Sequence, residues 1–540
     1  MKRYSKITPE GTRDFLFEES ELKIKTENAI TNVFEKHLYK KVITPTIEYF
    51  DVFNSDNIGI LSEDMYKLSD NKGRLTVLRP DNTAPIARMV ATRLKSTDFP
   101  VRLYYNQNVF VKSKSLSGKM NEISQCGIEL IGESGIDADI EALSIAVETM
   151  LACSSEAFKI EIGHAEFFNS VLEKMNLSKW QKDEICRLTE SKNYSSLVDL
   201  LDTLPDSKEK ELVRNLPRLF GSIDVIKEAR EFYTDSKAEK SFSYLETLYK
   251  KLCEKGLQKY ISFDLGLVNR SNYYTGVIFR GYTVGTGLTV LSGGRYDNLL
   301  AEYGNDAAAI GFGVDVSAVC IALNEKINIS RPIRIALTKG RLEKSSVRLF
   351  KTMGLDTTEL ENKGRRLILP VDKYEAVLAK APDVITYVEH GVCDIGIVGK
   401  DTIAEHSSSF YEVIDLGIGK CKFALACPKN ANFFDGYKRK VIATKYPKVA
   451  SGYFESIGMD VDIIKIEGSV ELAPLLGLAD GIVDIVETGS TLRENGLEVV
   501  CDIMPISARV VVNMASMKLR KNEIDEFLSE LELASKVADC

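Results

Sequence analysis

The sequence predicts a multidomain protein in which an α+β block precedes an α/β block. In the first block, strand-like runs at 101–105 and 261–265 flank a long charged stretch. From residue 333 onward, strand and helix patterns alternate, and a short polar segment before a proline separates the two blocks. The length of 540 residues allows two to four domains of roughly 100–200 residues each.

The first block runs from residue 1 to about 325. Within it, residues 155–258 carry apolar side chains at helical spacing, and this pattern predicts a helical insertion. The block closes with residues 308–313, which an amphipathic helix at 317–324 follows. Residues 326–332, Lys-Ile-Asn-Ile-Ser-Arg-Pro, are the predicted linker.

The second block, 333–540, alternates strands and helices. A strand at 333–337 leads through Lys339-Gly340-Arg341 into a helix that ends near Gly354. A second strand, 394–398, is followed by Gly399-Lys400-Asp401. This alternation predicts α/β architecture with mostly parallel strands.

Composition narrows the classes of function. Hydrophobic residues make up 44% and charged residues 27%, which is typical of a globular protein in water. A net charge of −8 argues against a broad nucleic-acid-binding surface. We find neither a signal peptide nor an apolar run of about 18 residues, so neither export nor membrane insertion is expected. The ten cysteines form no Cys-x-x-Cys pair and the four histidines are far apart, which favours reduced thiols in the cytoplasm over a zinc site.

The segment from Asp484 to Thr491 carries the strongest chemical signal. An apolar strand at 482–486 runs into Thr488-Gly489-Ser490-Thr491, and one helical turn follows that Gly496 stops. Strand, small-residue loop and helix start together aim backbone N–H groups at an anion, and the three hydroxyls add donors. The carboxylates of Asp484 and Glu487 suit ribose hydroxyls or Mg²⁺. Taken alone, the pattern fits a phosphate-binding loop and an ordinary N-capped turn equally well.

The wider motif set resembles ATP phosphoribosyltransferase, the first enzyme of histidine biosynthesis. Glu471, Gly477, Asp484, Thr488-Gly489 and Thr491-Leu492 fall at the signature spacing of that family. Further matching motifs span nearly the whole second block: Ala336-Leu-Thr-Lys-Gly-Arg-Leu342, Tyr387-Val-Glu-His-Gly391, Asp394-Ile-Gly-Ile-Val-Gly-Lys-Asp401, Gly417-Ile-Gly-Lys-Cys421, Ala443-Thr-Lys-Tyr-Pro447 and Ile506-Ser-Ala-Arg-Val510. The resemblance implies a two-lobed fold like that of periplasmic solute-binding proteins. The chain ends soon after the last motif, where long-form members continue into a regulatory domain, so the short form is expected.

This resemblance implies a pentosyl transfer, in which N1 of ATP attacks the anomeric carbon of 5-phosphoribosyl 1-pyrophosphate (PRPP) and pyrophosphate leaves. Mg²⁺ is expected through the substrate phosphates, without a site made by protein ligands alone. The departing pyrophosphate requires cations. We expect Arg341 and Arg365 to be the main clamps, because arginine binds phosphate in a bidentate manner, with Lys339 and Arg366 as further phosphate contacts. The other candidates for the substrate site are Glu471, Gly399, Lys400 and Asp401.

The first block resembles histidyl-tRNA synthetase and its paralogues. The motifs are Thr8-Pro-Glu-Gly-Thr-Arg-Asp14, Leu78-Arg-Pro-Asp-Asn-Thr-Ala-Pro-Ile-Ala-Arg88, Gln125-Cys-Gly-Ile-Glu-Leu-Ile-Gly132, Asn272-Tyr-Tyr-Thr-Gly276 and Gly293-Gly-Arg-Tyr-Asp297. Together they cover the core of a class II aminoacyl-tRNA synthetase. This resemblance implies an antiparallel sheet flanked by helices.

Departures from the synthetase pattern argue against tRNA charging. Val111 follows Phe110 where the family has an arginine, Asn269 replaces the catalytic arginine with Arg270 displaced by one, and Ala318 replaces the arginine of the third motif. Adenylate formation needs these cations on the ATP phosphates. The anticodon-binding domain is also missing, because the phosphoribosyltransferase block follows directly.

What remains resembles the regulatory subunit of the short-form enzyme, here fused ahead of the catalytic part. The resemblance implies that histidine inhibits the enzyme through this block and that the chain forms a homo-oligomer. The candidate histidine-pocket residues are Asp81, Thr83, Gln125, Tyr273 and Tyr274. An inherited scaffold with histidine bound elsewhere is the alternative for these residues. For the whole chain, a tRNA ligase and a non-catalytic small-molecule sensor are the alternatives.

Overall fold

The structure is a computed structural model, and it describes residues 6–54, 60–95, 97–113, 115, 117–153, 157–268, 274–324, 331–406, 409–429 and 431–538. The chain divides into two compact units, Met1–Ser330 and Arg331–Cys540. Residues 326–330 of the predicted linker lie outside the described residues.

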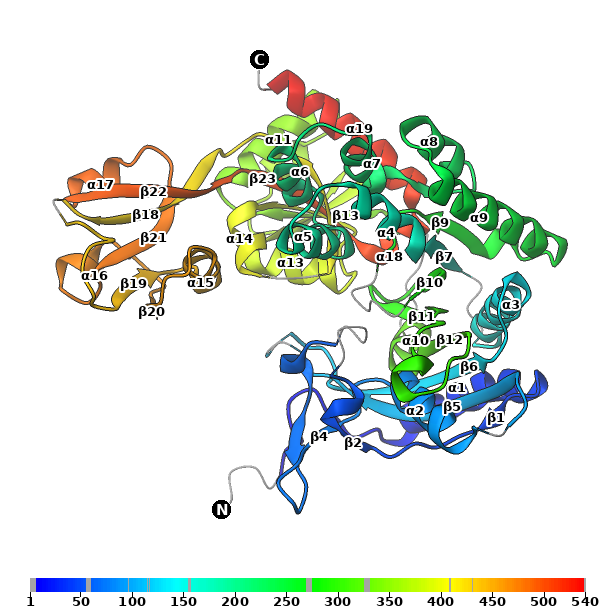
Figure 1. Cartoon of the computed structure of the whole chain (residues 1–540). Helices are drawn as coiled ribbons and strands as arrows, with labels where there is room; N and C mark the ends of the chain where they lie inside the picture. The colour runs from blue at the N-terminus through cyan, green and yellow to red at the C-terminus, as the bar shows by residue number, and fades with distance from the viewer. Residues whose placement is uncertain are drawn as a thin grey trace. The chain divides into compact units, whose positions relative to one another are not determined.

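The N-terminal unit is built on a nine-stranded sheet (Figure 1). Its strands, in spatial order, are β1 (Lys40–Lys41), β5 (Val101–Phe110), β6 (Glu122–Ile131), β12 (Ala309–Asp315), β11 (Thr289–Arg295), β10 (Val277–Thr283), β7 (Phe158–His164), β9 (Ile261–Asp264) and β8 (Phe220–Gly221). All neighbours are antiparallel except β1 with β5 and β7 with β9, so the predicted antiparallel sheet is confirmed. A three-stranded sheet lies apart, with the order β2 (Ile47–Tyr49), β4 (Leu75–Leu78) and β3 (Lys67–Ser69).

The two faces of this large sheet bury different side chains, because side chains alternate along a strand. Three helices cover one face: α1 (Phe17–Lys36), which contacts the other two, α3 (Ile136–Ala152) and α10 (Val316–Asn324). On the other face, Leu103, Tyr105 and Ile131 share a core with helix α2 (Thr83–Arg93). Gln125 and Glu129 alternate in step with Ile131 along β6, so they lie on the α2 face.

The predicted insertion is helical, but it begins later than the sequence suggested. Residues 158–164 form β7, a strand of the large sheet, in which the alternating apolar residues Phe158, Ile160 and Ile162 bury one face. The helices that follow are α4 (Ala165–Lys174), α5 (Lys179–Glu190), α6 (Tyr194–Asp202), α7 (Lys208–Asn215), α8 (Val225–Phe232) and α9 (Ser236–Glu254).

A buried ion pair ties these helices to the sheet. Lys192 Nζ lies 3.0 Å from Asp264 Oδ2 and donates to the Gly266 carbonyl at 2.9 Å. Only 2% and 3% of the two side chains are exposed. The junction between α5 and α6 is therefore fixed to the end of β9.

The C-terminal unit has two lobes, each with its own sheet. The first sheet has the order β14 (Ile368–Val371), β15 (Tyr374–Ala379), β13 (Ile333–Thr338), β16 (Ile395–Gly399), β23 (Ala508–Asn513) and β17 (Phe410–Asp415). The helices of this lobe are α11 (Arg341–Thr352), α12 (Thr358–Glu361), α13 (Ala381–Glu389), α14 (Lys400–Glu405), α18 (Met514–Leu519) and α19 (Lys521–Ala538).

The second lobe lies between β17 and β23 in the sequence (Figure 1, orange). Its sheet has the order β20 (Val461–Lys465), β19 (Lys440–Thr444), β21 (Gly481–Val486), β18 (Cys421–Pro428) and β22 (Leu497–Ile506). Helix α15 (Pro447–Ser456) contributes to the core on one face, and α16 (Leu472–Leu475) and α17 (Ser490–Glu494) contribute to the core on the other.

The expectation of mostly parallel strands is wrong, because both sheets are mixed. Parallel pairing holds only between β13 and its neighbours β15 and β16, and between β19 and its neighbours β20 and β21. The chain passes from one lobe to the other and back, and the strands around these crossings, β17, β18, β22 and β23, join their sheets antiparallel. A tight turn at Asp372, with φ of +50°, also makes β14 and β15 a hairpin.

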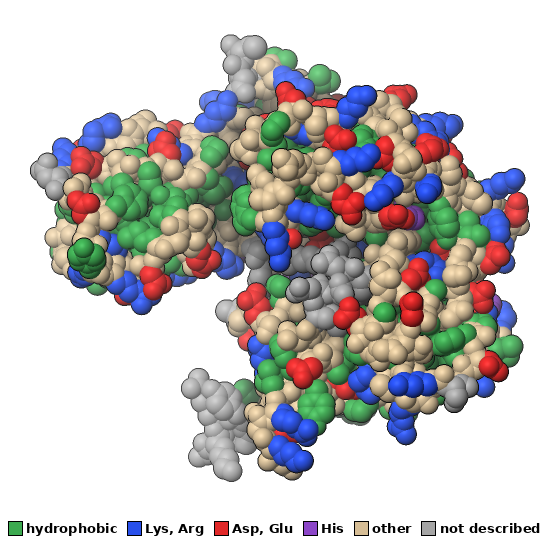
Figure 2. All heavy atoms as spheres, viewed as in Figure 1, with side chains coloured by type: hydrophobic (Ala, Val, Ile, Leu, Met, Phe, Trp, Pro, Cys, Tyr) green, Lys and Arg blue, Asp and Glu red, His purple; other side chains and the backbone are tan. Residues whose placement is uncertain are grey.

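The surface carries charges of both signs. Figure 2 shows Lys and Arg side chains interspersed with Asp and Glu over the visible face of each unit. Among the described helices, none combines the length and the apolar character that a membrane crossing requires.

Candidate functional site

Four parallel strands of the C-terminal unit end in the segments that the sequence singled out. In the first lobe, β13 ends before Lys339-Gly340-Arg341 and β16 ends at Gly399. In the second lobe, β19 ends before Lys445-Tyr446 and β21 ends before the loop 487–491. The carboxyl ends of parallel strands are the usual ligand-binding edge of such sheets.

Hydrogen bonds align these ends within each lobe. Thr338 Oγ1 donates to the Ile397 carbonyl at 2.9 Å, which holds β13 beside β16. Thr444 Oγ1 donates to the Val483 carbonyl at 2.6 Å, which holds β19 beside β21.

Two contacts then join the lobes. Arg341 Nη1 lies 2.8 Å from Glu487 Oε2, so the start of α11 meets the predicted phosphate loop. Glu405 Oε2 accepts the backbone N–H groups of Lys448 and Val449 at 3.1 and 3.4 Å, and thereby caps the first turn of α15. The structure therefore brings Arg341 and the 487–491 loop to one site.

The phosphate loop has the geometry that its sequence predicts. Gly489 adopts φ of +69°, a left-handed conformation that glycine tolerates, and α17 begins at the next residue. Thr488 Oγ1 and Ser490 Oγ lie 3.0 Å apart, and both side chains are exposed, as is that of Thr491. These hydroxyls are available to a ligand at the end of β21.

Asp484 lies on β21, three residues before this loop, and is half-buried. Burial raises the pKa of its carboxyl group to about 6, and the nearby Glu471 carboxylate adds to the increase. Glu471, which sequence reasoning had assigned separately, is therefore close enough to Asp484 to act on it electrostatically, and the two are called the acidic pair below.

The structure places the remaining predicted cations at the same edge of the first sheet. Leu378 N–H donates to the Leu367 carbonyl at 2.8 Å, and β14 runs antiparallel to β15, so Arg365 and Arg366 lie just before β14 at the edge where β13 ends. Both arginines and Lys339 are exposed, and Arg366 is 2.6 Å from Glu359.

Lys400 is a correction among the predicted substrate-site residues. Its ammonium lies 2.8 Å from Glu412 Oε2, and the two side chains are only 4% and 1% exposed. Because both side chains are enclosed in the lobe, Lys400 is not exposed to a substrate. The carboxylate of Asp401 instead folds back over Gly399, where a Cβ atom would be only 2.1 Å from Oδ1.

Sequence reasoning missed three residues at this site. Tyr446 lies near the carboxylates of Asp401 and Asp484, and burial together with these charges raises the pKa of its hydroxyl. Lys445 is close enough to act electrostatically on Asp484. Arg493 extends back over the loop, since Nη1 would be 3.2 Å from a Cβ atom on Gly489. Lys445 and Tyr446 lie in the quoted motif Ala443–Pro447, so their position after a strand was the available signal.

The N-terminal unit holds a separate buried polar cluster. Asp81 accepts the backbone N–H groups of Thr83 and Ala84 at 3.1 and 3.3 Å and so caps helix α2. Gln125 Oε1 accepts from Asn82 Nδ2 at 2.9 Å. Thr83 Oγ1 donates to Glu129 Oε1 at 2.8 Å. Asp81, Thr83 and Gln125 therefore come together, as the sequence predicted.

Glu129 is the central residue of this cluster, and sequence reasoning missed it. Tyr296 donates a hydrogen bond to its carboxylate, and burial raises the pKa of Glu129 to about 8. Gly311 leaves the space that this carboxylate occupies, since a Cβ atom there would be 1.8 Å from Oε2. The signal was its spacing of four residues from Gln125 on one strand, which puts both on one face.

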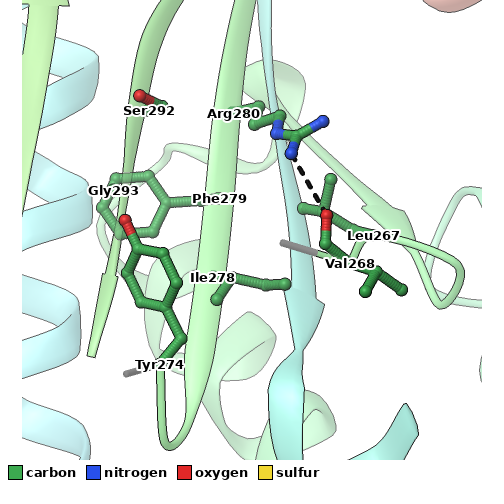
Figure 3. Close-up of a pocket in the computed structure, with 8 residues that line it drawn as sticks. All are labelled: Leu267, Val268, Tyr274, Ile278, Phe279, Arg280, Ser292 and Gly293. Atoms are coloured by element: carbon green, nitrogen blue, oxygen red, sulfur yellow. Dashed lines mark hydrogen bonds between the residues drawn. The ribbon is translucent and has the colours of Figure 1, made fainter. Parts of the chain in front are cut away.

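Tyr274 lies over Gly294 and lines a small pocket beside β10 (Figure 3). Arg280 on β10 points to the chain after β9 and donates to the Val268 carbonyl at 3.1 Å. Tyr273, the fifth predicted pocket residue, lies outside the described residues, as do Asn269 and Arg270.

Comparison with known proteins agrees with this division. A family model described as ATP phosphoribosyltransferase matches residues 380–533. An ATP phosphoribosyltransferase of Clostridium kluyveri is 63% identical over 205 residues, which cover 38% of this chain and 94% of the relative. The chain belongs to the ATP phosphoribosyltransferase family.

The N-terminal unit of this family member has its own relatives. A family model described as Histidyl-tRNA synthetase matches residues 11–319. An ATP phosphoribosyltransferase regulatory subunit of Clostridium botulinum is 41% identical over 333 residues, covering 61% of this chain and 79% of the relative. The crystal structure of a protein described as an ATP phosphoribosyltransferase regulatory subunit/histidyl-tRNA synthetase, from Bacillus halodurans, aligns with a TM-score of 0.57 and 31% identity, covering 70% of this chain and 94% of that one. This ATP phosphoribosyltransferase thus carries a regulatory-subunit-like unit ahead of its catalytic unit.

Proposed function

We propose that the chain catalyses the first step of histidine biosynthesis, the transfer of a 5-phosphoribosyl group from PRPP to N1 of ATP. The N1–C1′ bond forms as the bond from C1′ to the pyrophosphate oxygen breaks, and pyrophosphate leaves. The observation that carries this proposal is the match of the catalytic unit over 94% of an ATP phosphoribosyltransferase, with the matched motifs meeting at one site. No covalent enzyme nucleophile is required.

In this proposal, the protein positions two anionic substrates and stabilises the leaving group. The hydroxyls of Thr488, Ser490 and Thr491 hold the 5-phosphate. Arg341 and Arg365 neutralise the departing pyrophosphate, and Lys339 and Arg366 contact phosphate oxygens at the same sheet edge. Glu487, Gly399 and Asp401 border the substrates.

The acidic pair Asp484 and Glu471 suits Mg²⁺, since carboxylate and phosphate oxygens are its preferred ligands. When bound to the substrate phosphates, Mg²⁺ neutralises negative charge on the leaving pyrophosphate. Among the described residues, no cluster of three or more His, Cys, Asp or Glu side chains is arranged to hold a metal ion. The acidic pair therefore suits a Mg²⁺ ion that enters the site already bound to the substrate phosphates.

We also propose that histidine inhibits the enzyme by binding at the cluster of Asp81, Thr83, Gln125, Glu129 and Tyr274. Carboxylate and amide oxygens there can accept hydrogen bonds from an ammonium group and an imidazole N–H. A homo-oligomer in the cytoplasm completes the proposal. All the described cysteines are free, which suits a reducing compartment.

The test is an absorbance assay of adenine modification with the full chain, ATP, PRPP and Mg²⁺, repeated over a range of histidine concentrations. We expect turnover that histidine suppresses. No product under any condition would favour a non-catalytic sensor. Turnover that ignores histidine would remove only the regulatory part. Charging of tRNA with histidine by the same preparation would instead support a ligase.

A further inference from the structure

Glu343 occupies a central place between the two turns that carry the predicted cations. It lies in the first turn of α11, and only 7% of the residue is exposed. One carboxylate oxygen, Oε2, accepts the backbone N–H of Gly340 at 3.4 Å. That contact fixes the turn that bears Lys339 and Arg341.

The other carboxylate oxygen of Glu343 pairs with the ammonium group of Lys363. Lys363 opens a second tight turn, in which its carbonyl accepts the Arg366 N–H at 3.0 Å and Gly364 adopts φ of +59°. Arg365 is the third residue of this turn, and its side chain is exposed. The single carboxylate of Glu343 therefore anchors both turns.

We propose that the Glu343–Lys363 ion pair is a positioning device that sets the spacing between the Lys339–Arg341 turn and the Lys363–Arg366 turn, so that both bind one pyrophosphate group. This inference rests on the proposed function of the site. Exposed arginines on separate turns bind a shared anion well only when their backbones are held in place. Glu343 and Lys363 are positioning residues, since neither carries the charge that meets the substrate.

The stability of the lobe is a poor explanation for this pair. Removing water from two charges costs free energy that their attraction repays only in part, and well-packed apolar side chains often serve as well. The pair instead connects two segments of the chain that lie about 20 residues apart at the edge where β13 ends.

The chain supplies a matched control on the same helix. Lys351 in the last turn of α11 pairs with Glu361 at 2.6 Å, and these side chains are 52% and 47% exposed. This pair also connects α11 to the segment before β14, but it lies at the far end of the helix from Arg341.

The experiment measures kcat, KM for PRPP and inhibition by pyrophosphate in the full chain, with thermal unfolding in parallel. The variants are Glu343→Gln, Lys363→Met, the double variant, Lys363→Arg and the control Glu361→Gln. We expect the two single variants to lose on the order of tenfold in kcat/KM for PRPP and to bind pyrophosphate correspondingly less well. The double variant should be no worse than either single variant. Lys363→Arg should keep kcat/KM within about twofold of the parent value, because arginine can still pair with Glu343. Glu361→Gln should do the same, because it changes only the exposed pair at the far end of α11.

Several results would overturn the positioning role. One is unchanged kinetics in folded Glu343→Gln and Lys363→Met. Another is a lower melting temperature with unchanged kcat/KM and pyrophosphate inhibition, which would make the pair purely structural. If Glu343→Gln fails to fold, the kinetics of Lys363→Met are compared with those of Lys363→Arg, because Lys363 is the more exposed member of the pair. An inactive parent chain would refute the proposed function instead, before any variant is compared.

Discussion

At the scale of single residues, Arg341, which we propose to bind the departing pyrophosphate, already has an ion-pair partner in the structure. Arg341 and Glu487 are 62% and 57% exposed, and an exposed ion pair contributes only about 0–1 kcal/mol. A pyrophosphate group carries more charge than one carboxylate and can accept two parallel hydrogen bonds. Substrate binding can therefore replace Glu487 at Arg341 at little cost in free energy.

The first residue-scale prediction concerns Arg365→Ala. If Arg365 acts on the departing pyrophosphate, its loss should lower kcat on the order of a hundredfold while PRPP binding weakens by less than about tenfold. Steady-state kinetics with a direct PRPP binding measurement separates the two quantities. Lys344→Ala, which removes an exposed charge from α11, is the control. Equal loss in binding with no loss in rate would refute the role.

A second prediction concerns the pH dependence of Asp484. Its pKa rises from 3.8 to about 6, so the ionised form that Mg²⁺ or ribose requires is lost below that pH. We expect kcat/KM for PRPP to fall as pH drops through 6, and this acid limb to be absent in Asp484→Asn.

The raised pKa of Asp484 has the opposite effect on stability: activity is expected to fall at low pH, whereas its contribution to stability is lost at high pH. A raised carboxyl pKa stabilises the folded state below the unfolded pKa, and that contribution is lost as pH rises through about 6. Asp484→Asn should therefore melt at a higher temperature than the parent at pH 7.5, and this gain should shrink toward pH 4. A lower melting temperature at pH 7.5 would contradict the assigned burial.

At the scale of elements, Lys192 and Asp264 show how the helical insertion is held. Lys192 lies in the loop between α5 and α6 with φ of +55°, and its side chain reaches Asp264 at the end of β9. That segment leads into Leu267 and Val268, which line the small pocket beside β10. The insertion therefore supports the wall of the pocket in addition to its own core.

For this element we predict a large cost when one charge is removed. Lys192→Met removes the ammonium group that faces the buried Asp264 carboxylate, and the free energy of unfolding should fall by about 3–5 kcal/mol. Denaturant unfolding provides the measurement. A Lys192→Met, Asp264→Leu double variant should recover most of the loss. The control is Lys227→Met, whose partner Asp224 is exposed, and it should change stability by less than about 0.5 kcal/mol.

Sequence patterns predicted the elements around the site well, but not how their strands pair. The strands near 333 and 395, the helix after Arg341 and the turn at Gly489 all follow from local periodicity and glycine conformation. The antiparallel strands β18, β22 and β23 depend on the two passages between lobes, which no local pattern records. Lys400 was misjudged for a related reason, since Glu412 lies on a neighbouring part of the fold that its motif does not reveal.

At the scale of the whole molecule, one chain contains both a catalytic and a regulatory-subunit-like unit. Inhibition requires histidine to bind one state of the enzyme more tightly than another. The polar cluster around Glu129 is well separated in the sequence from the residues around Asp484. The direct test of coupling between the two units is therefore a substitution in the regulatory-subunit-like unit whose effect is measured as turnover by the catalytic unit.

The whole-molecule prediction uses Glu129→Gln in the full chain. The Glu129 carboxyl group can lose its proton to pair with an ammonium or imidazolium group, whereas the amide cannot, so the histidine concentration that halves turnover should rise at least tenfold. The control is Glu122→Gln, on the same strand, where a carboxylate oxygen accepts a hydrogen bond from Asn108 Nδ2 at 2.7 Å. Equal sensitivity to histidine in both variants would place the effector elsewhere.

The position of the second lobe in the chain has a consequence for biosynthesis. Strand β23 lies between β16 and β17, yet it is translated after the whole second lobe. Until the ribosome passes Asn513, the first lobe has a gap in its sheet, with β16 and β17 each lacking a neighbour. The ribosome must therefore complete the second lobe before the sheet of the first lobe can close, although synthesis of the first lobe begins earlier. Arrested nascent chains that stop before Ala508 should remain sensitive to protease in residues 395–415, and chains extended past the C-terminus should become resistant.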